Sequence, residues 1–149
     1  MDIDENESIY KPESQQIVGC AMEVLNELRH GFHEKPYENS LVVEFRLKKI
    51  PFVQQQKFDI LYKEQKVGDY IPDLLVFGKI VVDTMVIEKI TDREIGQMMN
   101  YLKITGYRLG YILNFKKPKT RMETCSQMII SVHRCSSVVY SALNTTEHL

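Results

Sequence analysis

Residues 69–89, with the sequence DYIPDLLVFGKIVVDTMVIEK, are the stretch that decides the expected fold. Two runs rich in Leu, Ile and Val flank Phe77-Gly78-Lys79, and this pattern predicts two extended strands joined by a glycine turn. Asp73 and Asp83 interrupt these runs, although burying a lone carboxylate is energetically costly. The two side chains therefore either share one divalent cation or face solvent on a half-exposed sheet, and the stretch alone leaves both interpretations open.

The composition is that of an ordinary globular protein in one domain. The chain has 149 residues, which is enough to bury a core. It has 19 Lys and Arg residues against 20 Asp and Glu residues. The resulting net charge of −1 excludes a basic field over the whole chain of the kind that advertises a nucleic-acid-binding protein. Any binding of nucleic acid must therefore depend on a local site.

The expected location follows from the cysteines and the hydropathy pattern. The three cysteines contain no C-x-x-C motif and form no evident disulfide framework, which fits a reducing compartment. No apolar run reaches the length of a membrane-spanning helix, and the acidic N-terminus does not resemble a signal peptide. We expect a cytoplasmic or nuclear protein without a membrane partner. The sequence leaves open whether the chain is a monomer or a homodimer.

Two amphipathic helices are expected before the strands. Residues 1–14 are polar and acidic, and we expect them to be flexible. Apolar residues recur at helical spacing from Gln15 to Arg29, and His30-Gly31 is expected to end this helix. The second helix begins near Pro36, and one stripe of it contains Tyr37, Leu41, Phe45 and Lys48.

Glu34 has an unusual place in this second helix. It precedes Tyr37 by three residues, so it falls on the stripe that is expected to face the core. A carboxylate on a core-facing stripe suggests a functional group. The alternative is that Glu34 is an ordinary acidic residue of the first turn, which interacts favourably with the helix dipole.

Alternating polar and apolar residues continue the pattern after Pro51. From Phe52 to Lys63 the side chains fall on two faces with a period of two, which predicts one long strand. A turn through residues 63–66 connects this strand to the stretch at 69–89, so an antiparallel meander is expected. Residues 107–115 predict a further strand.

A helix is expected between the last two strands. Thr91 and Glu94 form the pattern of a capping box, and Gly106 is a typical residue to end a helix. Gln97 and Tyr101 lie four residues apart and therefore share one side of this helix. The strand–helix–strand crossover should be right-handed and should place the last strand parallel to the strand of Asp83.

The expected fold class is therefore α/β, with a mixed, α+β-like sheet and helices packed on it. We place the main domain at residues 15–115. Residues 116–149 form a C-terminal extension for which the sequence gives no clear secondary structure.

The sequence resembles a known family of proteins. Residues 31–37, GFHEKPY, match the G-x-x-E-x-x-Y signature of the GxxExxY family, a branch of the PD-(D/E)XK nuclease superfamily. The resemblance continues in order and with matching spacing through Gln56, Tyr62, Pro72-Asp73-Leu74-Leu75-Val76, Thr91, Gln97, Asn100-Tyr101-Leu102, Gly106, Gly110 and Asn114-Phe115. It implies a restriction-endonuclease-like core, which agrees with the fold expected from the residue patterns.

The resemblance also implies a site. Glu34 matches the acid of the helical signature, Asp73 the acid of the P-D motif and Asp83 the acid of the D/E-x-K motif, while Gln97 and Tyr101 match a pair on the following helix. The acids Glu34, Asp73 and Asp83 would hold Mg²⁺ or Mn²⁺, which prefer oxygen ligands. The implied activity is metal-dependent hydrolysis of nucleic acid, with DNA favoured over RNA as the partner.

The sequence departs from the superfamily pattern at one position. The D/E-x-K lysine is replaced by Met85, which carries no charge to stabilise a transition state. Lys79 and Lys89 are the neighbouring lysines, although Lys79 is four residues from Asp83 and Lys89 lies beyond the expected strand. Catalysis should therefore be weak or lost. The alternative is an inactive nuclease-fold module that binds nucleic acid or a protein.

A zinc site at His30, His33 and Glu34 is a weaker hypothesis. Tetrahedral zinc needs further ligands, and no neighbouring sequence spacing supplies them.

Overall fold

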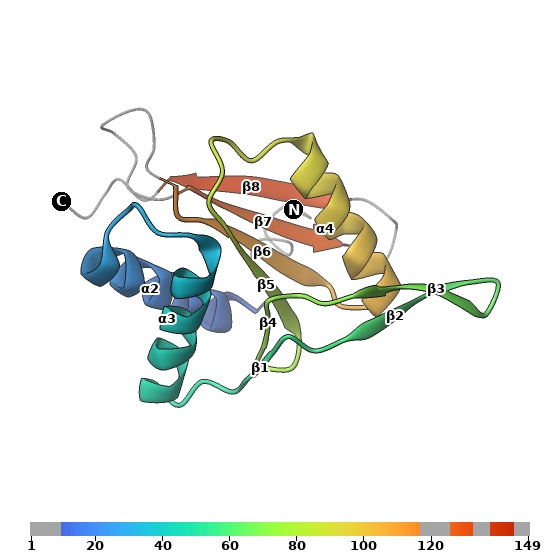
Figure 1. Cartoon of the computed structure of the whole chain (residues 1–149), viewed down its shortest axis with the longest axis horizontal. Coiled ribbons are helices and arrows are strands. Elements are labelled where there is room, and N and C mark those ends of the chain that lie inside the picture. The colour runs from blue at the N-terminus through green and yellow to red at the C-terminus, as the bar shows by residue number, and fades with distance from the viewer. Residues whose placement is uncertain (1–9, 117–125, 133–137, 145–149) are drawn as a thin grey trace.

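A central sheet lies between two layers of helices in the computed structural model, which describes residues 10–116, 126–132 and 138–144 (Figure 1). The elements in chain order are α2 (Lys11–Leu28), α3 (Glu34–Leu47), β1 (Phe52–Gln54), β2 (Phe58–Tyr62), β3 (Gln65–Tyr70), β4 (Leu74–Val76), β5 (Ile80–Met85), α4 (Asp92–Thr105), β6 (Leu109–Asn114), β7 (Ser126–Val132) and β8 (Val138–Asn144). The fold is a mixed α/β architecture consistent with the predicted nuclease-like core.

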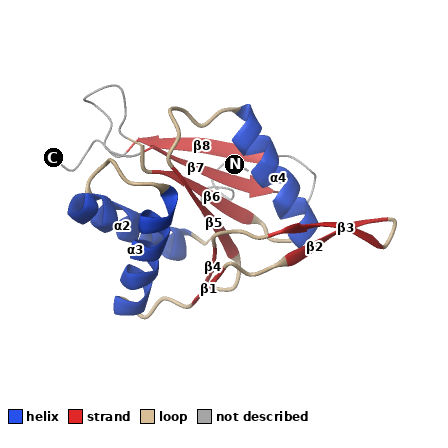
Figure 2. Cartoon of the chain, in the orientation of Figure 1, coloured by secondary structure: helices blue, strands red, loops and turns tan. Residues whose placement is uncertain are grey.

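The six-stranded sheet has the order β1-β4-β5-β6-β7-β8 (Figure 2). Strands β5 and β6 are parallel, and every other neighbouring pair is antiparallel. The parallel pair confirms the predicted crossover through α4. Strands β7 and β8 lie in the C-terminal segment, where no secondary structure was predicted, and they continue the sheet beyond β6.

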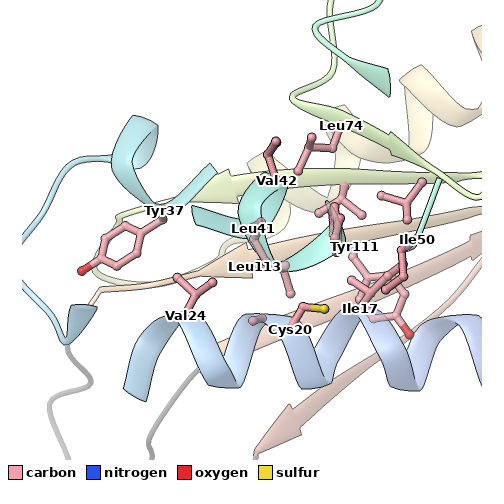
Figure 3. Packing of buried hydrophobic residues seen from close by; sticks show 14 of the residues in the cluster. Ile17, Cys20, Val24, Tyr37, Leu41, Val42, Ile50, Leu74, Tyr111 and Leu113 are labelled. Carbon is pink, nitrogen blue, oxygen red and sulfur yellow. The ribbon is translucent and has the colours of Figure 1, made fainter. Parts of the chain in front are cut away.

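Helices α2 and α3 cover one face of the sheet. Their apolar stripes pack on alternate residues of β4, β5 and β6, because successive side chains of a strand point to opposite faces. Figure 3 labels part of this core: Ile17, Cys20, Val24, Tyr37, Leu41, Val42, Ile50, Leu74, Tyr111 and Leu113. Tyr37 stacks on Phe115 with ring centroids 4.5 Å apart, and its hydroxyl donates a hydrogen bond to the carbonyl of Arg29 at 2.6 Å. The predicted core role of Tyr37 is confirmed.

Helix α4 covers the other face through Ile95, Met98 and Leu102. Met98 packs directly over Gly110 of β6, where an added Cβ atom would lie 2.7 Å from Met98 Sδ. Glycine at this position therefore lets the helix pack closely on β6. Thr91 and Glu94 form the predicted capping box, and Gly106 ends the helix with φ +82°.

The predicted long strand from Phe52 to Lys63 is wrong. Gln55 has φ +59°, and the chain leaves the sheet there, so β1 pairs with β4 while β2 pairs with β3 in a separate two-stranded sheet. Lys63 and Glu64 both have positive φ, as a tight hairpin turn requires. The resulting β2–β3 hairpin projects from the body of the protein (Figure 1). In place of the expected single meander, the β2–β3 hairpin forms its own sheet between β1 and β4 in the chain, while β1, β4 and β5 belong to the main sheet.

The first helix also differs from its predicted bounds. Helix α2 begins at Lys11, four residues before the predicted start and within the segment expected to be flexible, because Pro12 is tolerated in a first helical turn. The helix ends at Leu28, where Arg29 rather than Gly31 is the C-cap. The domain boundaries at residues 15 and 115 stay a prediction. No helix in the described part of the chain combines the length and the apolar character needed to cross a bilayer.

Candidate metal centre

Asp73 and Asp83 lie side by side where the β4–β5 ladder ends. Leu74 pairs with Val82 in that ladder, so the next residues outward are Asp73 and Asp83. The backbone N–H of Asp73 donates a hydrogen bond to Asp83 Oδ1 at 3.1 Å. Asp73 Oδ2 in turn accepts hydrogen bonds from the Thr84 backbone N–H at 2.8 Å and from the Thr84 hydroxyl at 3.0 Å. The local backbone therefore fixes both carboxylates.

Each of these carboxylates keeps one oxygen available. Within the described residues, Asp73 Oδ1 and Asp83 Oδ2 accept no hydrogen bond, whereas the second oxygen of each group is held by a protein donor. A divalent cation is bound through such carboxylate oxygens, and Mg²⁺ commonly uses only one or two of them together with water. The donor set of Asp73 and Asp83 therefore fits a hard cation.

Both acids open onto one pocket of about 320 Å³. The pocket is lined by Asp69, Tyr70, Ile71, Asp73, Asp83, Thr84, Met85 and Tyr101. Asp69 and Ile71 are exposed, whereas Tyr70 and Thr84 are buried. The predicted site residues Asp73, Asp83 and Tyr101 are thus brought together, and Met85 shares their pocket.

The electrostatics of the pocket favour a positive partner. Burial, followed by the negative charge of Asp73, raises the pKa of the Asp83 carboxyl to about 7. Burial also raises the pKa of the Asp73 carboxyl, although the hydrogen bonds from Thr84 oppose this change. Among the charged residues, Glu38 raises the pKa of both groups and Lys35 lowers that of Asp73. Two adjacent acids that resist ionisation are typical of a functional site.

The buried carboxylate of helix α3 belongs to Glu38. Glu34 is the first residue of α3 and is exposed, so its predicted core-facing position is wrong, and its place in the first turn matches the alternative of a dipole partner. Glu38 is only 2% exposed. Its Oε2 atom accepts three hydrogen bonds, from Lys35 Nζ (3.2 Å), Gln54 Nε2 (2.6 Å) and Gln55 Nε2 (3.0 Å).

The sequence does contain a signal for Glu38. The residue precedes Leu41 by three positions, Val42 by four and Phe45 by seven, so it lies on the same helical stripe as these buried side chains. The family signature drew attention to Glu34 instead, one turn earlier. Within the described residues, Glu34 is not among the side chains that line the pocket.

An aromatic stack connects α4 to the base of the β2–β3 hairpin. The rings of Tyr70 and Tyr101 are stacked with centroids 3.7 Å apart and an interplanar angle of 12°. Phe58 lies beside Tyr70 at 6.3 Å. Gln97, one turn before Tyr101, is exposed and lies outside the described pocket lining. Tyr70 had no distinguishing sequence pattern, because its partner Tyr101 lies 31 residues away.

Neither of the two lysines considered from the sequence is part of the described pocket lining. Lys79 is engaged at the other end of β5, where its Nζ lies 2.6 Å from Glu13 Oε2 and 4.3 Å from the centroid of the Tyr10 ring. Lys89 is exposed in the loop between β5 and α4. Lys35 reaches Glu38 at 3.2 Å, and its charge acts on Asp73. Lys35 is therefore a better-placed candidate for a compensating charge than either lysine considered from sequence.

No group of three or more His, Cys, Asp or Glu side chains within the described ranges is arranged to hold a metal ion. The predicted three-acid cluster of Glu34, Asp73 and Asp83 is therefore not assembled, and two acids remain. The zinc hypothesis gains no support either, because His30 Nδ1 lies 2.9 Å from the carbonyl oxygen of Phe115 and this contact fixes the loop after α2.

Comparison with known proteins agrees with the fold. The family model described as the PD-(D/E)XK nuclease superfamily matches residues 11–127 of the chain. No curated protein and no solved structure gives a significant match.

Proposed function

The chain belongs to the PD-(D/E)XK nuclease superfamily, and from this premise we propose that it hydrolyses phosphodiester bonds of DNA slowly, with Mg²⁺ or Mn²⁺ as the cofactor. Within that superfamily we assign it to the GxxExxY branch, on the order and spacing of the matching residues.

The observation that carries the proposal is the pair of adjacent acids in one pocket. Asp73 and Asp83 each keep an oxygen free of hydrogen bonds from the described residues, and both have a raised pKa. A divalent cation relieves the repulsion between such acids and uses the available oxygens as ligands. When bound, the cation supplies Lewis acidity towards a phosphate oxygen and lowers the pKa of a coordinated water.

The side chains around the two acids have separate roles in this proposal. Asp73 and Asp83 hold the cation. Thr84 fixes the orientation of Asp73 through two hydrogen bonds. Tyr101 lines the pocket on the side of α4, and its ring is held there by stacking on Tyr70.

Glu38 and Lys35 extend the proposed site towards α3. Glu38 acts on the two acids through its charge and would support a bound cation from outside the pair of acids that hold it. Lys35 supplies positive charge near Asp73, although its side chain is 58% exposed and its effect is weakened by solvent. Glu34 and Gln97 stay candidate site residues, and their substitution would test whether they contribute to activity.

Met85 explains why we propose a low rate. A lysine two residues after the acid would direct a charged donor into the pocket from the same face of β5. Methionine offers no charge and no donor, and the loss of one such transition-state stabiliser typically lowers the rate by about 10²–10³-fold.

The test is a cleavage assay on plasmid DNA and on matched DNA and RNA oligonucleotides, with Mg²⁺ and with Mn²⁺. We expect weak cleavage of DNA that depends on the metal. Asp73→Asn is the matched control, because the amide oxygen still accepts from Thr84 while the charge is lost, and Asp73→Ala removes the ligand altogether. Cleavage that persists in both variants would mean that another nuclease contaminates the sample or that the proposed site is wrong.

Met85 also favours a second function, in which the protein binds nucleic acid without cleaving it. In that case a fluorescent DNA oligonucleotide would bind in the presence of Mn²⁺ but remain intact during prolonged incubation. Binding that Asp73→Asn weakens, together with the absence of cleavage, would favour this second function over catalysis.

A further inference from the structure

Among the described residues, the buried hydroxyl of Tyr70 has no hydrogen-bond partner. Tyr70 ends strand β3 and is 5% exposed. Its oxygen atom makes no hydrogen bond with any of the described residues. A buried hydroxyl without a partner is costly, so such a group in a native fold calls for an explanation.

Packing does not supply this explanation. The Tyr70 ring stacks on Tyr101 and lies beside Phe58 through its apolar faces, and phenylalanine would make the same contacts. The stack also restricts the ring, so the hydroxyl cannot turn freely towards another part of the protein. The aromatic stack therefore holds the oxygen in place but does not explain why the ring carries a hydroxyl.

The place of Tyr70 indicates where its partner belongs. Tyr70 lines the same pocket as Asp73 and Asp83, and the charges of both acids act on its hydroxyl. A cation held by these carboxylates would bring further acceptor oxygens into the pocket. These oxygens would belong either to water on the cation or to a phosphate. A neutral donor beside them suits these oxygens, and Met85, which lines the same pocket from β5, supplies no donor.

We propose that the Tyr70 hydroxyl donates a hydrogen bond to an oxygen atom bound to the cation of the Asp73–Asp83 pocket. This inference rests on the proposed function. The oxygen belongs either to a water ligand of the cation or to a phosphate of the nucleic acid, and these two sources share one acceptor chemistry. Tyr70 thereby provides part of the polarisation that the missing lysine would provide.

The test compares Tyr70→Phe with Tyr107→Phe in the full chain. Tyr107 contacts Phe58 in the same aromatic cluster at 5.9 Å but lies outside the described pocket lining, so its variant controls for loss of a tyrosine hydroxyl from this cluster. Mn²⁺ binding is measured by calorimetry, and binding of a fluorescent DNA oligonucleotide is measured with Mn²⁺ present. The melting temperature without metal is measured for every variant.

We expect Tyr70→Phe to weaken binding by about tenfold, the effect of one lost hydrogen bond, and Tyr107→Phe to leave it unchanged. Weaker binding of Mn²⁺ alone would identify a water ligand as the acceptor, whereas weaker binding of DNA alone would identify a phosphate oxygen. The metal-free melting temperature should stay the same or rise, because the variant removes a hydroxyl without a partner.

Other outcomes contradict the inference in distinguishable ways. If the natural protein binds Mn²⁺ and Tyr70→Phe binds Mn²⁺ and DNA equally well, the inference about Tyr70 is wrong and the proposed function stands. A fall in the metal-free melting temperature with unchanged binding would assign the hydroxyl to an ordered structural water. If the natural protein binds neither Mn²⁺ nor DNA, the proposed function and the inference fail together.

Discussion

Met85 and Asp83 project from the same face of strand β5 and line the same pocket. A lysine at position 85 would therefore place its ammonium beside two carboxylates, where its charge is compensated rather than isolated. We expect Met85→Lys to increase DNA cleavage by up to about 10²-fold, since a preorganised charge stabilises the transition state.

The measurement is the initial rate of Mn²⁺-dependent cleavage of a plasmid. Adding Asp73→Asn to the Met85→Lys background should abolish the gain, which controls for contaminating nuclease. Met85→Arg adds charge with a different reach and provides a comparison for geometry. Robust cleavage by the natural protein, lost on Asp73→Asn, would mean that another group replaces the missing lysine, and Lys35→Met would then test Lys35.

Glu34 and Glu38 provide a matched pair on helix α3. Glu38 is buried and acts on both pocket acids through its charge, whereas Glu34 is exposed. We expect Glu38→Gln to lower Mn²⁺ affinity by about tenfold, the usual effect of losing an outer-shell carboxylate, and Glu34→Gln to change it little. Calorimetric titration of both variants with Mn²⁺ checks this expectation. A larger loss of affinity in Glu34→Gln than in Glu38→Gln would assign the supporting role to Glu34.

The raised pKa of Asp83 predicts how stability depends on pH. The folded state binds a proton on Asp83 more tightly than the unfolded state does, because the pKa rises from 3.8 to about 7 on folding. The contribution of Asp83 to stability is therefore fully present below about pH 4 and is lost as the pH rises through about 7. The metal-free protein should become less stable over this range.

Urea denaturation at several pH values between 5 and 8 tests this expectation. Asp83→Asn keeps an oxygen that accepts from the Asp73 N–H and cannot ionise, so its unfolding free energy should fall less with pH than that of the natural protein. The variant should consequently be the more stable of the two at pH 8. Parallel curves for the two proteins would contradict the assignment.

At the scale of secondary structure, the capping box of α4 helps to position the site. Thr91 starts α4 with a capping box, and α4 carries Tyr101 into the pocket three turns later. Thr91→Ala should lower the unfolding free energy by about 1 kcal/mol, because the first turn loses a side-chain acceptor for its N–H groups. Arg93→Ala leaves the cap intact and should have a smaller effect. Urea denaturation measures both, and equal losses would argue against the cap.

The sequence predicted those elements whose signals are local. The α4 cap, its closing Gly106 and the turn at residues 77–79 depend on neighbouring residues, and all are present. The long strand from Phe52 to Lys63 was wrong because its alternation continues across Gln55, where the backbone turns out of the sheet. Polar alternation specifies a strand but does not specify which strand it pairs with.

The residues of the candidate site also differ in whether the local sequence could predict them. Asp73 and Asp83 could be predicted because they interrupt apolar strands, and strand register brings them together. Glu38 and Tyr70 were missed. The neighbours that give them a functional context come from distant segments, since Glu38 meets Gln54 and Gln55 while Tyr70 meets Tyr101. These contacts depend on tertiary packing, which residue patterns along one segment do not encode.

At the scale of the whole molecule, a cation bound in the proposed pocket would couple metal binding to folding. Asp73 and Asp83 come from different strands and are adjacent only in the folded chain, so a cation that uses both binds the folded state and not the unfolded one. A metal concentration 100 times the dissociation constant adds about 2.7 kcal/mol of stability. For a chain of this length we expect a rise in melting temperature of about 5–10 °C.

Thermal denaturation in millimolar Mn²⁺, Mg²⁺ or no metal measures this rise, and Asp73→Asn provides the control. The variant removes one of two repelling charges, so without metal it should melt at the same temperature as the natural protein or higher. With metal it should gain much less, because one of the two ligands is gone. An equal rise in both proteins would place the metal elsewhere on the surface. If neither protein responds, the acids form no metal site, and their proximity would instead be maintained by the proton that Asp83 retains near neutral pH.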